Sequence, residues 1–403
     1  MQKKYLYILC AALAVTACRQ RQQSVTTPWG TEIGVDDDST AVGGALSLDE
    51  IVSGGELIML TISGPDNYFE YRGRSMGTQY LLCEKFAQQL GVSLRVEVCR
   101  DTADMVKRLQ SGDGDIVACQ IPRRSKGVLP CGATTATTSW AVSTANCQLA
   151  DTLNRWYNPS LLAQVKREER LAYSVGSVHR HVYAPMLDAS RGTISPYDHL
   201  FKAYAPSVRW DWRLMAAQCY QESTFDPRAY SWAGARGLMQ IMPSTAATLG
   251  LREEDMYTPE ANIAAAAKYL VRLNGLFGDV RSYSERINFV LASYNGGHFH
   301  IRDAMALARK HGRNPYRWAD VEEFVLKLSL PTYYSDPAVK HGYMRGAETV
   351  DYVARIRARW DKYRRVAGGG AQMRMSGDNP GVSAPSIGDY EPQKARRKNK
   401  YKI

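Results

Sequence analysis

Two neighbouring segments decide the fold of the C-terminal half of this chain: Gln221-Glu222-Ser223-Thr224-Phe225-Asp226-Pro227 and Gly234-Ala235-Arg236-Gly237-Leu238-Met239-Gln240-Ile241-Met242-Pro243. The residues before the first segment are good helix formers, and Asp211 is suited to cap their N-terminal end, which predicts a helix over 211–223. The second segment has glycines and a proline around an apolar run, which predicts an irregular connection that can approach a ligand closely.

Glu222 lies near the end of the predicted helix, on the same face as Met215 and Cys219. A carboxyl in this position loses hydration and faces the negative end of the helix dipole, and both effects favour the protonated form. A general acid needs that form at neutral pH. The alternative is a half-exposed surface glutamate at the end of an amphipathic helix.

Three motifs resemble the catalytic signature of soluble-lytic-transglycosylase-type enzymes, which cleave peptidoglycan with a lysozyme-like helical domain. They are the run from Glu222 to Ala246, the segment Leu291-Ala292-Ser293-Tyr294-Asn295-Gly296-Gly297, and the segment Glu348-Thr349-Val350-Asp351-Tyr352-Val353. The resemblance covers residues 196–366, and segments 330–334 and 341–346 are most similar to the membrane-bound lytic transglycosylase F subgroup.

The resemblance implies a role for seven residues of this chain. Glu222 is the expected acid and base, and the expected substrate-binding residues are Ser231, Gln240, Met242, Tyr294, Asn295 and Tyr352. Four of them also have a plainer interpretation: Ser231 as a turn hydroxyl, and Met242 and the two tyrosines as core side chains. No cofactor and no metal site are expected.

Glycoside hydrolysis ordinarily uses two carboxylates, and this motif supplies one. Asp226 precedes Pro227 and is expected to cap the turn. The resemblance implies a non-hydrolytic exo- or endo-acting lytic transglycosylase that cleaves the bond between N-acetylmuramic acid and N-acetylglucosamine, leaving a 1,6-anhydromuramoyl end. The alternatives are a hydrolytic muramidase on the same fold and a catalytically weak peptidoglycan-binding scaffold.

Residues 1–18 resemble a lipoprotein signal peptide. Lys3 and Lys4 precede a short apolar run, and Val15-Thr16-Ala17-Cys18 is similar to a bacterial lipobox. We expect lipid on Cys18, which would anchor the chain to a membrane without a spanning helix. The expected place is the periplasmic face of the outer membrane of a Gram-negative bacterium, with the inner membrane as the alternative, because Arg19 gives no retention cue. An ordinary signal peptide with a chance cysteine is the alternative.

Residues 19–54 are polar and predict a flexible tether, whereas 55–165 alternate strand and helix patterns. Expected strands lie at 57–62, 93–98, 115–119 and 139–143, and expected helices at 78–90, 102–110 and 149–157. This order resembles the first lobe of a periplasmic solute-binding domain. Only about twenty residues separate Cys119 from Ser139, so the second lobe is expected to be truncated. The module then either binds a small ligand or serves as a structural or regulatory platform.

The predicted fold class is therefore a multidomain chain, with an α/β solute-binding-like domain and a mainly α lysozyme-like catalytic domain at 196–366. Residues 166–195 are the expected linker, and 367–403 form a basic tail expected to be disordered. The net charge of +11 favours anionic peptidoglycan or lipid head groups as partners over nucleic acid. Basic tails can also serve solubility alone.

Six cysteines remain once Cys10 is removed with the signal peptide and Cys18 carries lipid. The envelope permits disulfides among them, although several fall in predicted elements and suit buried apolar positions. They are Cys83, Cys99, Cys119, Cys131, Cys147 and Cys219. The histidine pairs at 179 and 181 and at 298 and 300 are expected to be surface residues rather than metal ligands.

Overall fold

The computed structural model describes residues 44–173, 178–181, 188 and 191–366, together with two short N-terminal strands. Those strands, β1 Val25–Thr26 and β2 Glu32–Ile33, pair antiparallel within a unit that is separate from Ala45–Ile403. The predicted signal peptide with Cys18 and the basic tail at 367–403 lie outside the described residues. Among the residues that are described, no helix is long and apolar enough to cross a membrane.

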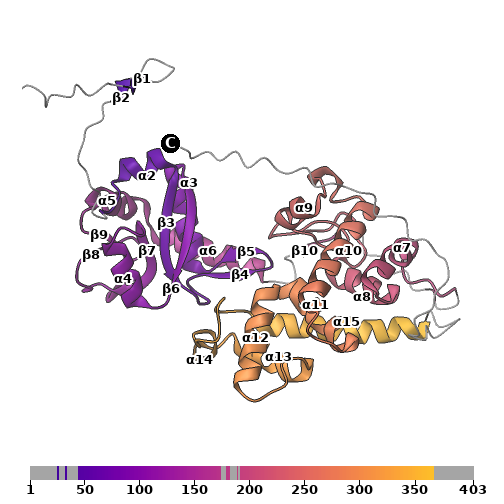
Figure 1. The fold of residues 1–403 in the computed structure, drawn as a ribbon. Helices are drawn as coiled ribbons and strands as arrows, with labels where there is room; N and C mark the ends of the chain where they lie inside the picture. Colours follow the sequence, from indigo (N-terminus) through magenta and orange to yellow (C-terminus); the bar gives the residue numbers. More distant parts are fainter. Residues whose placement is uncertain are drawn as a thin grey trace, which may run out of the picture. The chain divides into compact units, whose positions relative to one another are not determined.

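The first part of Ala45–Ile403 is an α/β domain (Figure 1). Its elements are α2 Leu48–Gly54, β3 Glu56–Ile62, β4 Phe69–Tyr71, β5 Arg74–Met76, α3 Thr78–Leu90, β6 Ser93–Cys99, α4 Thr102–Gln110, β7 Ile116–Pro122, β8 Val128–Cys131, β9 Thr138–Ser143, α5 Cys147–Trp156 and α6 Pro159–Ala172.

Five of these strands form a mixed sheet in the order β6-β3-β7-β9-β8. The pairs β3–β6 and β3–β7 are parallel, whereas β9 is antiparallel to both β7 and β8. Successive residues of a strand face opposite sides, so Met59 packs in one core with α3 and α5, and Leu60 packs in a second core with α4. The sheet is therefore buried on both faces.

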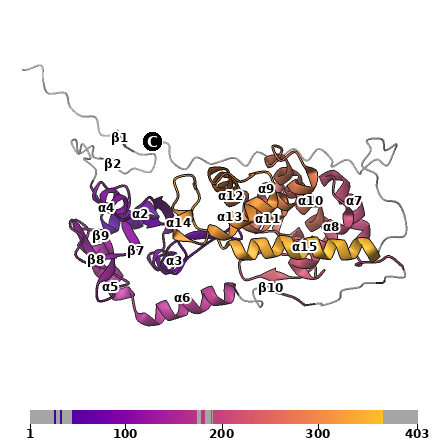
Figure 2. The same ribbon diagram turned by 90° about the horizontal axis from the view of Figure 1, so that it is seen from below.

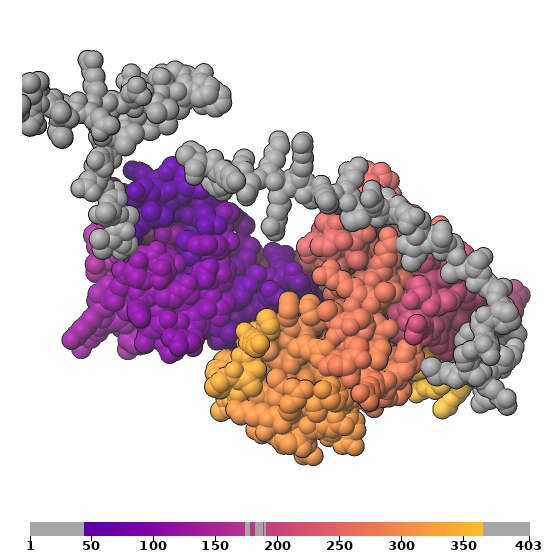
Figure 3. Space-filling view, in the orientation of Figure 1, coloured from indigo at the N-terminus to yellow at the C-terminus, as the bar shows by residue number. Residues whose placement is uncertain are grey.

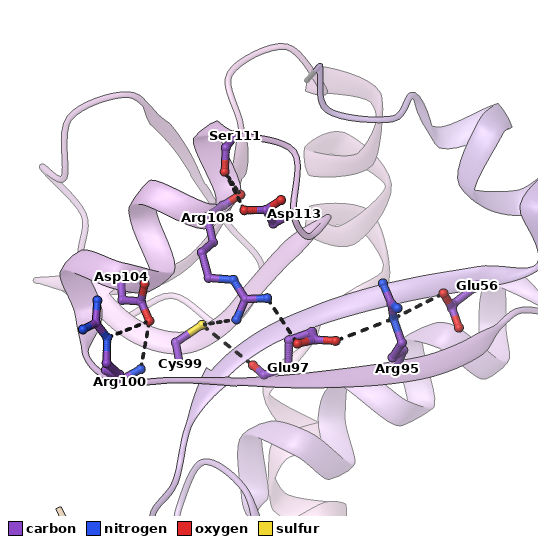
Figure 4. A network of polar contacts seen from close by, with 9 residues as sticks. All are labelled: Glu56, Arg95, Glu97, Cys99, Arg100, Asp104, Arg108, Ser111 and Asp113. Atoms are coloured by element: carbon purple, nitrogen blue, oxygen red, sulfur yellow. Dashed lines mark hydrogen bonds and ion pairs between the residues drawn. The ribbon is translucent and has the colours of Figure 1, made fainter. Parts of the chain in front are cut away.

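Charged side chains line the edge strand β6 (Figure 4). Arg95 pairs with Glu56, and Arg108 of α4 donates to Glu97 at 3.1 Å and to the sulfur of Cys99 at 3.7 Å. Charges on an edge strand discourage pairing with another chain. This end of the sheet is thus protected by its own side chains.

The second part is a helical domain with one continuous core, and its elements α10 to α13 form the orange surface of the space-filling view (Figure 3). Its elements are α7 Asp198–Val208, α8 Trp212–Ser223, α9 Pro243–Leu249, the 3-10 turn η2 Glu253–Asp255, α10 Pro259–Leu276, α11 Tyr283–Gly296, α12 His298–Lys310, α13 Trp318–Lys327, α14 Pro331–Tyr334 and α15 Gly346–Val366. Short strands β10 Val178–His179 and β11 Tyr230–Ser231 pair antiparallel beside them.

The long helix α15 packs along α8, α11 and α13 (Figure 2). Asp211 caps α8 by accepting from the Arg213 amide at 3.0 Å and also accepts from the Trp360 indole of α15 at 3.1 Å. At the other end, Thr224 closes α8 in the left-handed region. The contact of Asp211 fixes the start of α8 against α15, and Thr224 ends the helix two residues after Glu222.

Most sequence predictions of helices and strands are confirmed, including the 78–90 helix and its left-handed Gly91 cap. The predicted tether is wrong over 48–54, because Ser47 and Glu50 form a capping box that starts α2 and Ile51 is fully buried. The segment expected as a linker from residue 166 begins inside α6, which continues to Ala172. The hairpin β4–β5 and the strand β8 were not predicted; β8 occupies the gap between Cys119 and Ser139 where a second lobe would be inserted.

Candidate active site

A cavity of about 240 Å³ opens beside the C-terminal end of α8. Its walls come from α8, the connection from β11 to α9, the end of α11, the start of α12 and the turn between β4 and β5. Six of the seven residues that the resemblance nominates line it: Glu222, Ser231, Gln240, Met242, Tyr294 and Asn295. The structure therefore brings together residues that the sequence spreads over more than seventy positions.

Glu222 is half-buried, and loss of hydration raises the pKa of its carboxyl to about 7. The Tyr352 hydroxyl donates to its Oε1 at 2.6 Å and opposes this rise, as does the positive charge of Arg72. A carboxyl with a pKa near 7 is protonated often enough to donate a proton and ionised often enough to accept one. That balance suits a group that acts first as an acid and then as a base.

Tyr352 does not line the cavity but lies directly behind it, with 3% of its surface exposed. Its hydroxyl accepts from the Gln218 amide at 3.2 Å while donating to Glu222. Burial and the neighbouring carboxyl raise the pKa of Tyr352 well above its usual value, so the phenol keeps its proton. Gln218, which sequence reasoning missed, is fully buried on α8 one turn before Glu222.

The end of α11 approaches α15 closely at Gly296. A Cβ on Gly296 would lie 2.6 Å from the Thr349 hydroxyl, so only glycine allows this contact. The Thr349 hydroxyl donates to Asn295 Oδ1 at 2.8 Å, which fixes the amide of that side chain. On the preceding residue, the Tyr294 hydroxyl donates to the Met239 carbonyl at 2.8 Å and ties α11 to the loop across the cavity.

The loop from Ser231 to Met242 is held by its own hydrogen bonds. Ser231 Oγ accepts from the Ala235 amide at 2.9 Å. Gln240, whose φ is +47°, donates from Nε2 to the carbonyls of Ala229 and Gly237 at 3.1 and 2.9 Å. Its Oε1 is a buried acceptor without a partner among the described residues. The oriented amide can therefore accept a hydrogen bond from a hydroxyl or N–H group of a bound ligand.

Asp226 is fully buried and is not part of the cavity wall. It accepts from the Arg228 amide at 2.9 Å and from the His181 amide. The structure thus agrees with the expectation that Asp226 caps a turn.

Sequence reasoning missed four charged residues around the cavity. Glu70 and Arg72 line it from the β4–β5 hairpin, and Glu348 and Arg180 act on Glu222 electrostatically. Glu348 had a usable signal because it begins the third motif, one turn of α15 before the predicted site residue Tyr352. Arg72 and Arg180 had none, because nothing local in the sequence places them near α8.

The cysteines and histidines give one correction. The six cysteines are unpaired and all but Cys147 are buried, which fits the interpretation as small apolar side chains. His300, expected on the surface, is instead buried on α12, and burial lowers its pKa to about 4. In the part of the chain that the structure describes, no group of three or more acidic, histidine or cysteine side chains is arranged to hold a metal ion.

Comparison with known proteins finds a family model that covers part of this cavity. Residues 199–316 match the model of the Transglycosylase SLT domain. Glu348 and Tyr352 lie beyond the matched residues, so α15 adds to the site from outside the matched range.

The curated relatives of this chain include membrane-bound lytic murein transglycosylase F from Desulfosudis oleivorans, 27% identical with 78% of this chain and 91% of that protein covered. The protein of the same name from Maricaulis maris is 28% identical over 75% and 89%. The one from Pseudomonas fluorescens is 40% identical over a shorter region, 41% of this chain and 33% of that protein. The likeness to the first two extends well outside the SLT domain.

Solved structures similar to parts of the chain include the soluble lytic transglycosylase SLT70 from Escherichia coli, at 22% identity and a TM-score of 0.30, covering 52% of this chain and 28% of that one. The arginine-bound form of domain 1 from TmArgBP is also 22% identical, with a TM-score of 0.24, and covers 29% of this chain and 98% of that chain.

Proposed function

We propose that this chain is a peptidoglycan lytic transglycosylase, which cleaves the bond between N-acetylmuramic acid and N-acetylglucosamine without consuming water. The observation that carries the proposal is Glu222 itself: a cavity-lining carboxyl with a pKa of about 7, beside an SLT-type loop and the Tyr294-Asn295 pair. Asp226, the nearest acid in the sequence, is committed to backbone amides.

In the first step, Glu222 donates its proton to the oxygen between the two sugars, and the bond from that oxygen to C1 of the muramoyl residue breaks. The acetamido oxygen of the same muramoyl sugar stabilises the positive charge that develops at C1. Gln240 supports the sugar with its unpartnered Oε1, and Ser231, Met242 and Asn295 complete the wall of the cavity.

In the second step, Glu222 is ionised and removes the proton from the C6 hydroxyl of the muramoyl sugar, whose oxygen then bonds to C1. The products are a 1,6-anhydromuramoyl end and a free N-acetylglucosamine end, and Glu222 is protonated again. An internal hydroxyl held close to C1 has the advantage of proximity over bulk water. Tyr352 stabilises the ionised carboxyl between the two steps through its 2.6 Å hydrogen bond.

Mass spectrometry of the muropeptides that the full chain releases from purified peptidoglycan tests this proposal. Anhydromuramoyl products that disappear in the Glu222→Gln variant are expected. If neither protein releases muropeptides, the enzymatic proposal is overturned. The alternative of a peptidoglycan-binding scaffold would then be favoured.

A hydrolytic muramidase is the second candidate, because the cavity has another carboxyl in its wall. Glu70 of β4 is exposed there and belongs to the α/β domain. Hydrolysis would need this group to activate a water molecule opposite Glu222. Reducing muramoyl ends that disappear in Glu70→Gln would establish this candidate, whereas anhydro ends that persist in Glu70→Gln exclude it.

We also propose that Cys18 carries lipid and anchors the chain at the periplasmic face of the outer membrane. The lipobox-like Val15-Thr16-Ala17-Cys18 supports this, and the relatives are named membrane-bound. Metabolic labelling with a fatty acid should mark the wild-type chain and not Cys18→Ala, and membrane fractionation should recover the label with outer-membrane markers. Labelling of the variant would contradict the assignment.

A further inference from the structure

The turn between β4 and β5 brings the α/β domain into the wall of the active-site cavity. Arg72 and Gly73 form this turn with φ values of +50° and +72°, and both line the cavity. A Cβ on Gly73 would lie 3.6 Å from Met242 Cγ, so the turn rests against the loop that carries Gln240 and Met242. The α/β domain is therefore part of the site and not only its neighbour.

Arg72 and Tyr71 hold the same carboxylate of the helical domain. The Arg72 guanidinium pairs with Glu348 Oε1, and the Tyr71 hydroxyl donates to Glu348 Oε2 at 2.6 Å. Arg72 Nε is buried and has no partner among the described residues. Both carboxylate oxygens of Glu348 are thus bound by the hairpin, and the positive charge of Arg72 balances its negative charge.

Other contacts keep the hairpin against the helical domain. The Ser63 hydroxyl accepts from the Tyr343 amide at 2.8 Å, and Phe69 packs edge-on against the Tyr343 ring. The Arg345 guanidinium lies 3.8 Å from the centre of the Tyr173 ring, and that of Arg74 lies 4.3 Å from the centre of the Trp232 ring. The position of Arg72 therefore does not depend on its own ion pair alone.

Several elements present charged or titratable groups to Glu222. Arg72 and Arg180 are the positive charges, and Glu348 is the negative one. Among the described residues the groups are, by element, Cys219 on α8, Tyr352 and Glu348 on α15, Tyr294 on α11, Arg72 on the β4–β5 turn, Glu70 on β4 across the cavity and Arg180 next to β10. Arg72 is the member that acts in two ways, since it attracts the ionised Glu222 and also neutralises Glu348.

We propose that Arg72, supplied by the α/β domain, is a positioning residue of the active site that fixes Glu348 and sets the net charge facing Glu222. The inference rests on the proposed function of Glu222 as acid and base. Removing Arg72 takes a positive charge away from the surroundings of Glu222. It also leaves the negative charge of Glu348 uncompensated near the acid. Both changes make ionisation of Glu222 harder, so its pKa must rise when Arg72 is removed.

The test measures the pH profile of kcat/KM for release of anhydro products from soluble, uncrosslinked glycan strands, using the full chain in detergent. Activity requires protonated Glu222 and falls as pH rises through its pKa, and this fall is the basic limb of the profile. In Arg72→Met this basic limb should move up by about one pH unit. Glu348→Gln should move it down, the double variant should return it close to wild type, and Arg72→Lys should restore most of the wild-type position.

Arg74→Met is the matched control, because it removes one positive charge and one contact between the domains from the same hairpin without lining the cavity. Its basic limb should coincide with that of wild type. The inference is overturned if Arg72→Met lowers the rate equally at every pH, or if Arg74→Met moves the limb as far. Absence of anhydro products from the wild-type chain would instead refute the proposed function, so the two failures are distinguishable.

Discussion

The end of α8 and the turn that follows it hold two carboxyls only four residues apart, in different surroundings. Glu222 faces a cavity, and among the described residues its carboxyl accepts one hydrogen bond, from Tyr352, which does not offset the loss of water. Asp226 is fully buried but accepts from two backbone amides. Burial alone therefore does not make an acid catalytic; what matters is whether the protein replaces the lost water with donors.

Replacing Glu222 should give the largest effect on activity. Glu222→Gln keeps the shape of the side chain but removes the proton donor, so the rate should fall by about a hundredfold to ten-thousandfold. The circular dichroism spectrum should be unchanged, which shows that the fold survives. A variant that retains a tenth of the wild-type rate would break the comparison, because another group would then supply the proton.

Replacing Asp226 should affect stability before chemistry. Asp226→Asn substitutes an amide donor for one of the oxygens that accept backbone N–H groups, and the unfolding free energy should fall by about 1–3 kcal/mol. Urea unfolding gives the loss, and the rate at low temperature, where the variant is folded, should stay within a few-fold of wild type. If the rate instead falls as far as in Glu222→Gln with stability intact, Asp226 is a second catalytic carboxyl.

The pH dependence of the wild-type enzyme and of Tyr352→Phe should sharpen the contrast between the two acids. The wild-type rate should fall as pH rises through about 7, since Glu222 then loses the proton it must donate. The Tyr352 hydroxyl favours the ionised form, so Tyr352→Phe should move this limb to higher pH by up to about one unit. A limb that moves down would show that the hydroxyl favours the protonated acid.

The smallest predicted effect is on stability as a function of pH. The folded-state pKa of Glu222 lies above its ordinary value of 4.5, so the folded protein binds this proton more tightly than the unfolded chain does. Its stabilising contribution is complete below about pH 4.5 and is lost as pH rises through about 7. The melting temperature of Glu222→Gln, measured relative to that of the wild type, should therefore be higher at pH 8 than at pH 5. A constant difference between the two proteins would contradict the raised pKa.

Local signals in the sequence predicted helices in both domains. The cap at Asp211 and the run of good helix formers after it located α8, and Gly91 marked the end of α3. The hairpin β4–β5 has the right signals, an Arg-Gly turn between two alternating triplets, but strands of three residues are too short for periodicity to distinguish them from a loop.

The chemistry of the site was less accessible to sequence reasoning. Its helix position made Glu222 a candidate, whereas its expected role and the loop and tyrosine partners came from the resemblance to a known family. Arg72 could not be found, because its role depends on how the α/β domain packs against α15. The physical reason is general: a helix pattern shows which face is buried, but not which charge from a distant segment will lie against it.

The central claim is that the bond is cleaved without consuming water. Its most direct test is to digest peptidoglycan in water enriched in oxygen-18 and to measure the masses of the products by mass spectrometry. If Glu222 uses the internal C6 hydroxyl, the new muramoyl ends should contain no oxygen-18 and should be lighter than hydrolysis products by one molecule of water. Reducing ends that carry one oxygen-18 atom would contradict the account, because water would then have been the nucleophile.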